Sequence, residues 1–338
     1  MSTALLLPTL VALLPVLVFL AALRALDSFK LVGLRIVSAT VAAGAAAAGL
    51  SYLLHGWLLG QWAIDIVPFS RYVSPLTEEI LKGTIVIALV LTRRIGFLVD
   101  AAIFGFAVGT GFAVVENLHF LRLLPDASFS TWVVRGFGTA IMHGGCTAVF
   151  ALIGLTLCER ARNSPLLAFL PGLLLAAPLH SAFNHLSAVP QVATLSVMVA
   201  LPLLMMLVFQ RSEAATRDWL GKGFDSDVRM LELINAGQIA DTPVGRYLET
   251  LRERFAGPLL ADVLCYVRLY TELALRAKGL LMMRENGFEP ELDAAARDSI
   301  AELRYLETSI GKTGLRAVRP LLQMSQRELW QIYMIKQA

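Results

Sequence analysis

Long apolar runs fill the first 210 residues, and charged residues recur every few positions after Gln210. A run of about 20 apolar residues is long enough to cross a bilayer as an α-helix. Such runs predict seven spans, near residues 4–23, 36–58, 76–92, 97–121, 132–157, 165–188 and 190–210. After Gln210, apolar residues return at helical spacing between Gly and Pro residues. The pattern predicts an all-α protein in which a polytopic membrane helix bundle (residues 1–210) precedes a soluble helical domain (residues 211–338).

Composition supports the membrane assignment. Hydrophobic residues make up 57% of the 338 residues and charged residues 16%. The mean hydropathy of +0.66 is too high for a soluble globular protein. The net charge of +3 comes without a concentrated basic patch, so no nucleic-acid partner is expected. The three cysteines form no CxxC pair, which argues against a disulfide framework.

Positive charge is unevenly distributed over the predicted loops, which bears on orientation. The loops after the first, third and fifth spans, and the segment after the seventh, hold Arg24, Lys30, Arg35, Arg93, Arg94, Arg160, Arg162, Arg211, Arg217 and Lys222. The alternate loops hold only Arg71, Arg122 and Arg135. Because loops rich in Lys and Arg stay in the cytoplasm, we expect an external N-terminus. Residues 211–338 are then a cytoplasmic domain of a multi-pass protein of the plasma membrane.

Several polar side chains fall inside the predicted spans, where each charged group costs about 2.5–3.5 kcal/mol on insertion. They are Glu78, Glu79 and Lys82 in the third span; Glu116, Asn117 and His119 in the fourth; His143 in the fifth; and His180, Asn184 and His185 in the sixth. At about 1.5 Å of rise per residue, one acid or imidazole on each helix lies roughly 5 to 16 Å below the outer surface: Glu79, Glu116, His143 and His180. These groups can therefore share one pocket in the outer half of the membrane, whereas His119 and His185 are expected at the interface.

Helical spacing refines these candidates. Three pairs are four residues apart and therefore neighbours on one helix face: Glu78 with Lys82, His143 with Thr147, and His180 with Asn184. The second member of each histidine pair could orient its imidazole or donate a hydrogen bond to an oxyanion. Ser74 and Pro75 predict an N-cap and a first helical position, so that the helix dipole would favour ionised carboxylates just inside the helix.

A carboxylate and histidines in a wet pocket can activate water for hydrolysis, either directly as a general base or through a metal ion. Catalytic zinc commonly binds three His, Glu or Asp side chains plus water. Glu116, His143 and His180 form such a trio, which leaves Glu79 as the base. The chain lacks the HExxH spacing of the zincin proteases. The residues alone leave open the choice between zinc and a metal-free glutamate mechanism, and the choice between Glu78 and Glu79 as base.

Four motifs, in order across residues 70–190, carry a resemblance to a known family: EEILK (Glu78–Lys82), FAVVEN (Phe112–Asn117), His143 with Thr147, and HSAFN (His180–Asn184). With them the chain resembles the PrsW family of intramembrane proteases, distant relatives of the CAAX-prenyl-protease and bacteriocin-processing group. The resemblance implies a metalloprotease that cleaves a membrane-anchored protein, such as an anti-sigma factor. It implies a catalytic or metal-binding set of Glu78, Glu79, Glu116, His143 and His180. Lys82 and Asn184 are the supporting residues, and Asn117 and Thr147, which lie in the same motifs, complete the supporting set.

Two other functions fit the same residues. Chains of Glu and His in a helix bundle also relay protons in transporters. A catalytically inactive receptor could instead signal through residues 211–338, for which a cytoplasmic protein partner is expected. The simplest structural alternative is an ion pair between Glu78 and Lys82, together with interhelical hydrogen bonds from the histidines.

Overall fold

The computed structural model describes residues 3–29, 32–62, 64–158, 166–186, 189–253, 255–288, 294–318 and 321–322. In these ranges the chain is helical and contains no strand, which confirms the predicted all-α class. The chain divides into two compact units, Met1–Glu213 and Ala214–Ala338, and each has an apolar core of its own. Lys30, Arg160 and Arg162, which entered the orientation prediction, lie outside the described residues.

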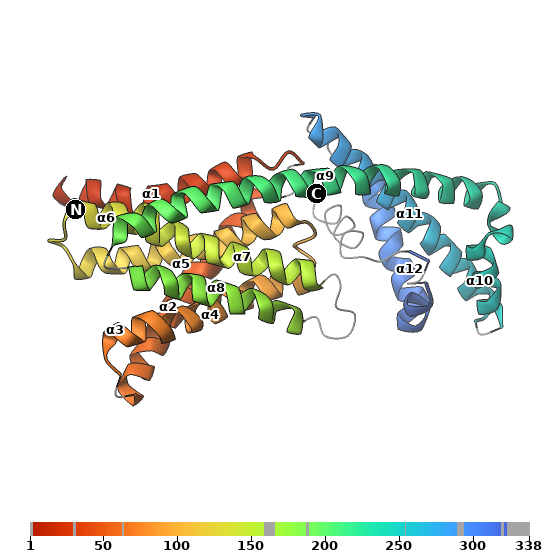
Figure 1. The fold of residues 1–338 in the computed structure, drawn as a ribbon. Helices are drawn as coiled ribbons and strands as arrows, with labels where there is room; N and C mark the ends of the chain where they lie inside the picture. Colours follow the sequence, from red (N-terminus) through yellow and green to blue (C-terminus); the bar gives the residue numbers. More distant parts are fainter. Residues whose placement is uncertain are drawn as a thin grey trace. The chain divides into compact units, whose positions relative to one another are not determined.

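The first unit is a bundle of long helices (Figure 1). Its elements are α1 (Thr3–Ala25), α2 (Leu34–Gln61), α3 (Ile66–Pro68), η1 (Phe69–Val73), α4 (Ser74–Leu91), α5 (Leu98–Leu123), α6 (Phe129–Val133), η2 (Val134–Thr139), α7 (Ala140–Cys158), η3 (Leu167–Phe169), α8 (Leu170–His185) and the first part of α9 (Pro190–Asn235). The segments η1 and η2 are π-helical turns. Each of them directly precedes a helix that carries candidate site residues, α4 or α7.

The helices α5 and α7 form the centre of this bundle. The helix α5 packs against α1, α2 and α7, and α7 packs against α4 and α8. In each of the two candidate spans that contain α5 and α7, 83% of the most apolar 18-residue stretch is buried inside the protein. In the other candidate spans the buried share of that stretch is 22–33%. A Cβ atom on Gly109 of α5 would come within 2.3 Å of the carbonyl oxygen of His143 on α7. Glycine therefore allows the two backbones to approach closely, and this contact sets the position of His143 in the bundle.

Among the described residues, six helical stretches are long and apolar enough to cross a membrane. They are Leu6–Ala25, Leu34–Gln61, Leu98–Leu123, Phe129–Cys158, Leu167–His185 and Pro190–Asn235. These stretches correspond to six of the seven predicted spans. The predicted third span is α4, a helix of 18 residues that is not among the six and carries Glu78, Glu79 and Lys82. A membrane span at α4 therefore stays a prediction.

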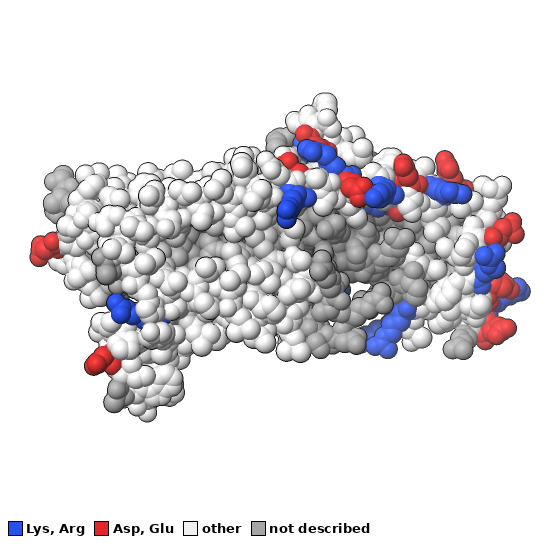
Figure 2. All heavy atoms as spheres, in the orientation of Figure 1, with Lys and Arg blue, Asp and Glu red and all other residues white. Residues whose placement is uncertain are grey.

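The second unit contains the rest of α9, followed by η5 (Gln238–Asp241), α10 (Pro243–Arg252), α11 (Gly257–Glu285) and α12 (Ala294–Val318). The helix α11 packs against α10 and α12. The apolar core of this unit includes Val263, Leu273 and Leu303. Buried Lys278 donates to Asp227 at 2.6 Å. On the face drawn in Figure 2, Lys, Arg, Asp and Glu gather over this unit, whereas the first unit presents mainly uncharged residues. The contrast matches the charge pattern of the sequence.

Candidate active site

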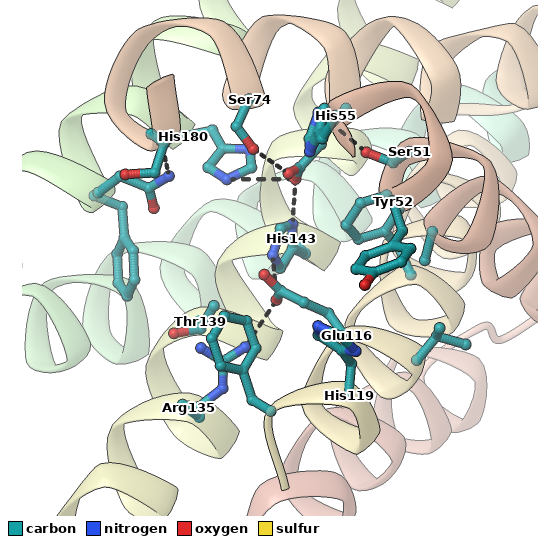
Figure 3. Close-up of a pocket in the computed structure, with 18 of the residues that line it drawn as sticks. Ser51, Tyr52, His55, Ser74, Glu116, His119, Arg135, Thr139, His143 and His180 are labelled. Carbon is teal, nitrogen blue, oxygen red and sulfur yellow. Dashed lines mark hydrogen bonds and ion pairs between the residues drawn. The ribbon is translucent and has the colours of Figure 1, made fainter. Parts of the chain in front are cut away.

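Four helices of the first unit bring the predicted site residues together. Glu78 and Glu79 lie on α4, Glu116 on α5, His143 on α7 and His180 on α8. Figure 3 shows the imidazoles of His143 and His180 side by side, with Glu116 next to His143. All five predicted residues take part in one connected cluster.

The centre of the cluster is one carboxylate oxygen between two imidazoles. Glu78 Oε2 lies 3.9 Å from Nδ1 of His143 and 3.8 Å from Nε2 of His180. The two rings are 4.7 Å apart between centroids and nearly perpendicular, at 85°. This oxygen is buried and has no hydrogen-bond partner among the described residues. Glu78, His143 and His180 thus each offer one ligand atom, and the three atoms lie within 4.8 Å of one another.

The other nitrogen of each imidazole faces a second carboxylate. His180 Nδ1 lies 2.9 Å from Glu79 Oε1, and His143 Nε2 lies 3.1 Å from Glu116 Oε2. In metal sites, a carboxylate behind a histidine fixes the tautomer and the orientation of the ring. Here both rings have such a carboxylate, so both present their remaining nitrogen toward Glu78.

The Glu79 side chain is completely buried, and both of its carboxylate oxygens accept hydrogen bonds. Lys82 Nζ donates to Glu79 Oε1 at 2.5 Å, and the Thr147 hydroxyl donates to Glu79 Oε2 at 3.4 Å. The Lys82 ammonium also lies 3.2 Å from His143 Nδ1. Lys82 therefore neutralises the buried carboxylate and places a positive charge beside the centre of the cluster.

Glu116 has a partner that the sequence analysis missed, Arg135. Arg135 Nη2 lies 3.0 Å from Glu116 Oε2, and Arg135 Nε donates to Asn117 Oδ1 at 2.9 Å. In the predicted topology Arg135 counts only as a loop charge. Its position three residues inside the predicted span at 132–157 was the signal, because an arginine inside a span is itself a candidate.

Each of the other supporting residues makes at least one hydrogen bond to another helical segment. Asn117 donates to the carbonyl of Ala12 on α1 at 2.7 Å. Thr147 donates to the carbonyl of His143 at 3.0 Å in addition to its bond to Glu79. Asn184 donates to the carbonyl of Ser70 at 2.9 Å. The hydrogen bonds of Thr147 and Asn184 thus differ from the predicted contacts to the imidazoles four residues before them.

The N-cap prediction for Ser74 is wrong. The helical backbone continues into α4 through η1, Val73 occupies the N-cap position, and the Ser74 N–H donates to the Phe69 carbonyl. The Ser74 hydroxyl instead donates to Glu78 Oε1 at 2.5 Å. Because the backbone amides are used inside a continuous helical segment, the side chains of Ser74 and Lys82 support the carboxylates in place of a free helix end.

A cavity of about 1290 Å³ borders the cluster. Residues of α2, η1, α4, α5, η2, α7 and α8 line it, and they include Glu78, Glu116, His143 and His180. This volume exceeds the roughly 300–1,000 Å³ of a typical small-molecule pocket, so a segment of polypeptide fits better than a metabolite. Glu78 thus lines the cavity, although its unpartnered Oε2 is itself buried.

Comparison with known proteins identifies the family of this chain. A family model described as PrsW family intramembrane metalloprotease matches residues 29–209, which is more than half of the chain and contains the whole cluster. No curated protein and no solved structure matched the chain. The family and the apolar helices together make this protein a multi-pass membrane enzyme that cleaves a membrane protein. The chain belongs to the PrsW family of intramembrane metalloproteases.

Proposed function

We propose that peptide-bond hydrolysis takes place in the cavity at the Glu78, His143 and His180 side chains. One observation carries the proposal: three helices, α4, α7 and α8, each contribute one ligand atom to a group within 4.8 Å. A relay of protons does not require such convergence on one point, whereas water activation does.

Zinc is the metal that these residues fit best. A buried carboxylate oxygen without a hydrogen-bond partner among the described residues and two inward imidazole nitrogens form a donor set that zinc accepts. Bound zinc would lower the pKa of a coordinated water to about 7 and polarise the substrate carbonyl. Lys82 Nζ, 3.2 Å from His143 Nδ1, has to release that nitrogen when a metal binds.

The proposed ligand set differs from the predicted trio in one residue. Glu116 uses Oε2 for both His143 and Arg135, so Glu78 replaces Glu116 as the carboxylate ligand. Glu116 and Glu79 then act from behind the imidazoles and hold their orientation. Without a metal, Glu78 Oε2 is also the oxygen best suited to take a proton from water, because the oxygens of Glu79 already have partners.

The substrate and the orientation follow from the membrane setting. We infer that the substrate is a membrane-anchored protein, such as an anti-sigma factor, whose chain enters the cavity from the outer half of the plasma membrane. The positive-inside pattern favours an external N-terminus and a cytoplasmic location for residues 211–338. That domain is then free to bind a cytoplasmic protein that regulates cleavage.

Substitution of the three inner residues tests the proposal. Glu78→Gln, His143→Ala and His180→Ala should each abolish cleavage of a co-expressed single-span substrate, with the protein still present and folded in the membrane. The matched control is His185→Ala on the same helix as His180, where the imidazole contacts the Ser181 carbonyl and the Tyr72 ring. Cleavage that persists in the three inner variants would reject the site.

A further inference from the structure

Arg135 contacts three groups of one helix from the π-helical turn η2. Its Nη2 lies 3.0 Å from Glu116 Oε2 and forms an ion pair with it, without a hydrogen bond, and its Nε donates to Asn117 Oδ1 at 2.9 Å. Its guanidinium lies 3.8 Å from the centroid of the Phe120 ring, within cation–π range. Three contacts in different directions leave the guanidinium little freedom to turn.

Arg135 and His143 both contact the same oxygen of Glu116, Oε2. Glu116 Oε2 lies 3.0 Å from Arg135 and 3.1 Å from His143 Nε2. The Glu116 side chain is 25% exposed and lines the cavity, so water competes for it. A carboxylate on a flexible side chain would otherwise exchange the imidazole for water, and the positive charge of the fixed guanidinium opposes that exchange.

The backbone around Arg135 is held as firmly as its side chain. Asn117 Nδ2 lies 2.7 Å from the carbonyl of Ala12 and 3.4 Å from the carbonyl of Arg135. A Cβ atom on Gly136 would come within 1.9 Å of the Val11 carbonyl oxygen, so η2 lies directly on the backbone of α1. π-Helical turns are often found at functional sites, where the extra residue redirects a side chain. The turn, α1 and α5 together aim Arg135 at Glu116.

We propose that Arg135 is a positioning residue for hydrolysis, which acts through Glu116 on His143. The guanidinium fixes Glu116 Oε2, Glu116 holds His143 Nε2, and the ring then presents Nδ1 to Glu78. This inference rests on the proposed function, because it assigns a purpose to the orientation of His143. Arg135 would otherwise be an arginine that only neutralises a partly buried carboxylate.

Kinetics of five variants separate these roles. Arg135→Ala should lower kcat about 10- to 100-fold, the usual effect of losing an outer partner of a metal ligand, with KM changed by less than about twofold because Arg135 acts through Glu116. The double variant Arg135→Ala/Glu116→Gln should lose no more than Glu116→Gln alone, because both changes break one chain of contacts. Arg135→Lys should recover part of the activity, since Lys supplies the charge but not the fork of donors. Arg94→Ala, an exposed arginine outside the cavity lining, is the matched control.

Two further readouts exclude a merely structural effect. Millimolar guanidinium should restore cleavage by Arg135→Ala and have no effect on Glu116→Gln, and zinc affinity of purified Arg135→Ala should fall about 10- to 100-fold.

Unchanged kcat, multiplicative losses in the double variant, or an unfolding temperature that falls in parallel with activity without guanidinium rescue would overturn the inference. If Arg135→Ala does not accumulate, Arg135→Lys decides: wild-type kcat and zinc affinity there contradict the role of the fork. If Glu78→Gln and His180→Ala still cleave, the proposed function and this inference both fail; if those two are inactive while Arg135→Ala is normal, only this inference fails.

Discussion

Glu79 Oε1 and His180 Nδ1 lie 2.9 Å apart and link α4 to α8 across 101 residues of sequence. Glu78, the residue before, faces the opposite nitrogen of the same imidazole at 3.8 Å. Consecutive residues of an α-helix point about 100° apart, so two adjacent carboxylates reach different sides of one ring. Glu79 has its oxygens engaged, and Glu78 keeps one oxygen that faces the centre of the cluster.

This difference predicts different effects of two isosteric substitutions. Glu78→Gln should abolish cleavage and leave the unfolding temperature in detergent unchanged or slightly raised, because a buried carboxylate with one oxygen unpartnered costs free energy. Glu79→Gln should abolish cleavage and also destabilise the protein by about 3–5 kcal/mol, because Lys82 then carries a buried charge without a counterion. Activity assays and thermal unfolding of both purified variants check the prediction. Equal losses of stability would contradict the two environments.

A second prediction concerns the buried pair itself. Lys82→Met alone should destabilise the protein, whereas Glu79→Gln together with Lys82→Met should recover most of the lost stability, because replacing both members of a buried ion pair is often nearly neutral. Cleavage should stay absent, since His180 still lacks its carboxylate. A double-mutant cycle of unfolding free energies measures the coupling. Lys222→Met, which removes the exposed pair with Asp218, serves as control and should change stability little.

Removal of the metal provides a third prediction. Treatment of purified enzyme with a chelator should abolish cleavage, and added zinc should restore it. Zinc at about 100 times its Kd should stabilise the fold by about 2.7 kcal/mol, and His180→Ala should lack this stabilisation because one ligand is missing. Elemental analysis and thermal unfolding check the two parts. Full activity of enzyme verified to be free of metal would favour a glutamate mechanism at Glu78.

The close approach of α5 and α7 predicts a fourth result. Gly109→Ala should lower the unfolding free energy by about 1–3 kcal/mol, the usual cost of overpacking, because its Cβ would come within 2.3 Å of the His143 carbonyl oxygen. It should also lower kcat, since α7 can relieve the clash only by moving His143. Gly60→Ala on α2 is the control, because nothing lies within 4 Å of a Cβ there. Equal stability and activity of the two variants would disprove the packing argument.

The division of the chain into two units predicts a fifth result. A protein truncated after Glu213 should keep a folded membrane unit, because that unit has its own apolar core. We expect it to cleave a single-span substrate in detergent, with altered rate or substrate choice in cells, where residues 211–338 would bind a partner. Thermal unfolding and cleavage by the purified fragment measure both. Loss of the fold on truncation would be evidence against independent units.

The sequence by itself determined the all-α class of the protein, six of its candidate membrane spans and the Glu and His residues that the structure gathers in one cluster. Apolar runs of membrane length can be identified without a structure. Charged residues such as Glu79 and Glu116 stand out within these runs, because burying a charge in a membrane span costs free energy. Their shared depth also follows from counting residues along each helix. The contact of Arg135 with Glu116 does not follow from the sequence, because the charge pattern of the loops carries no information on side-chain contacts between helices.

Only the tertiary structure decided which atoms meet. Spacing along one helix relates Glu78 to Lys82, but it does not fix how α4, α5, α7 and α8 are rotated relative to one another. That rotation places Glu78 between the two imidazoles and Glu116 on the far side of the His143 ring. The π-helical turns η1 and η2 add a further shift, because their extra residue changes the direction of the side chains that follow. Ser74 directly follows η1, and Arg135 lies within η2.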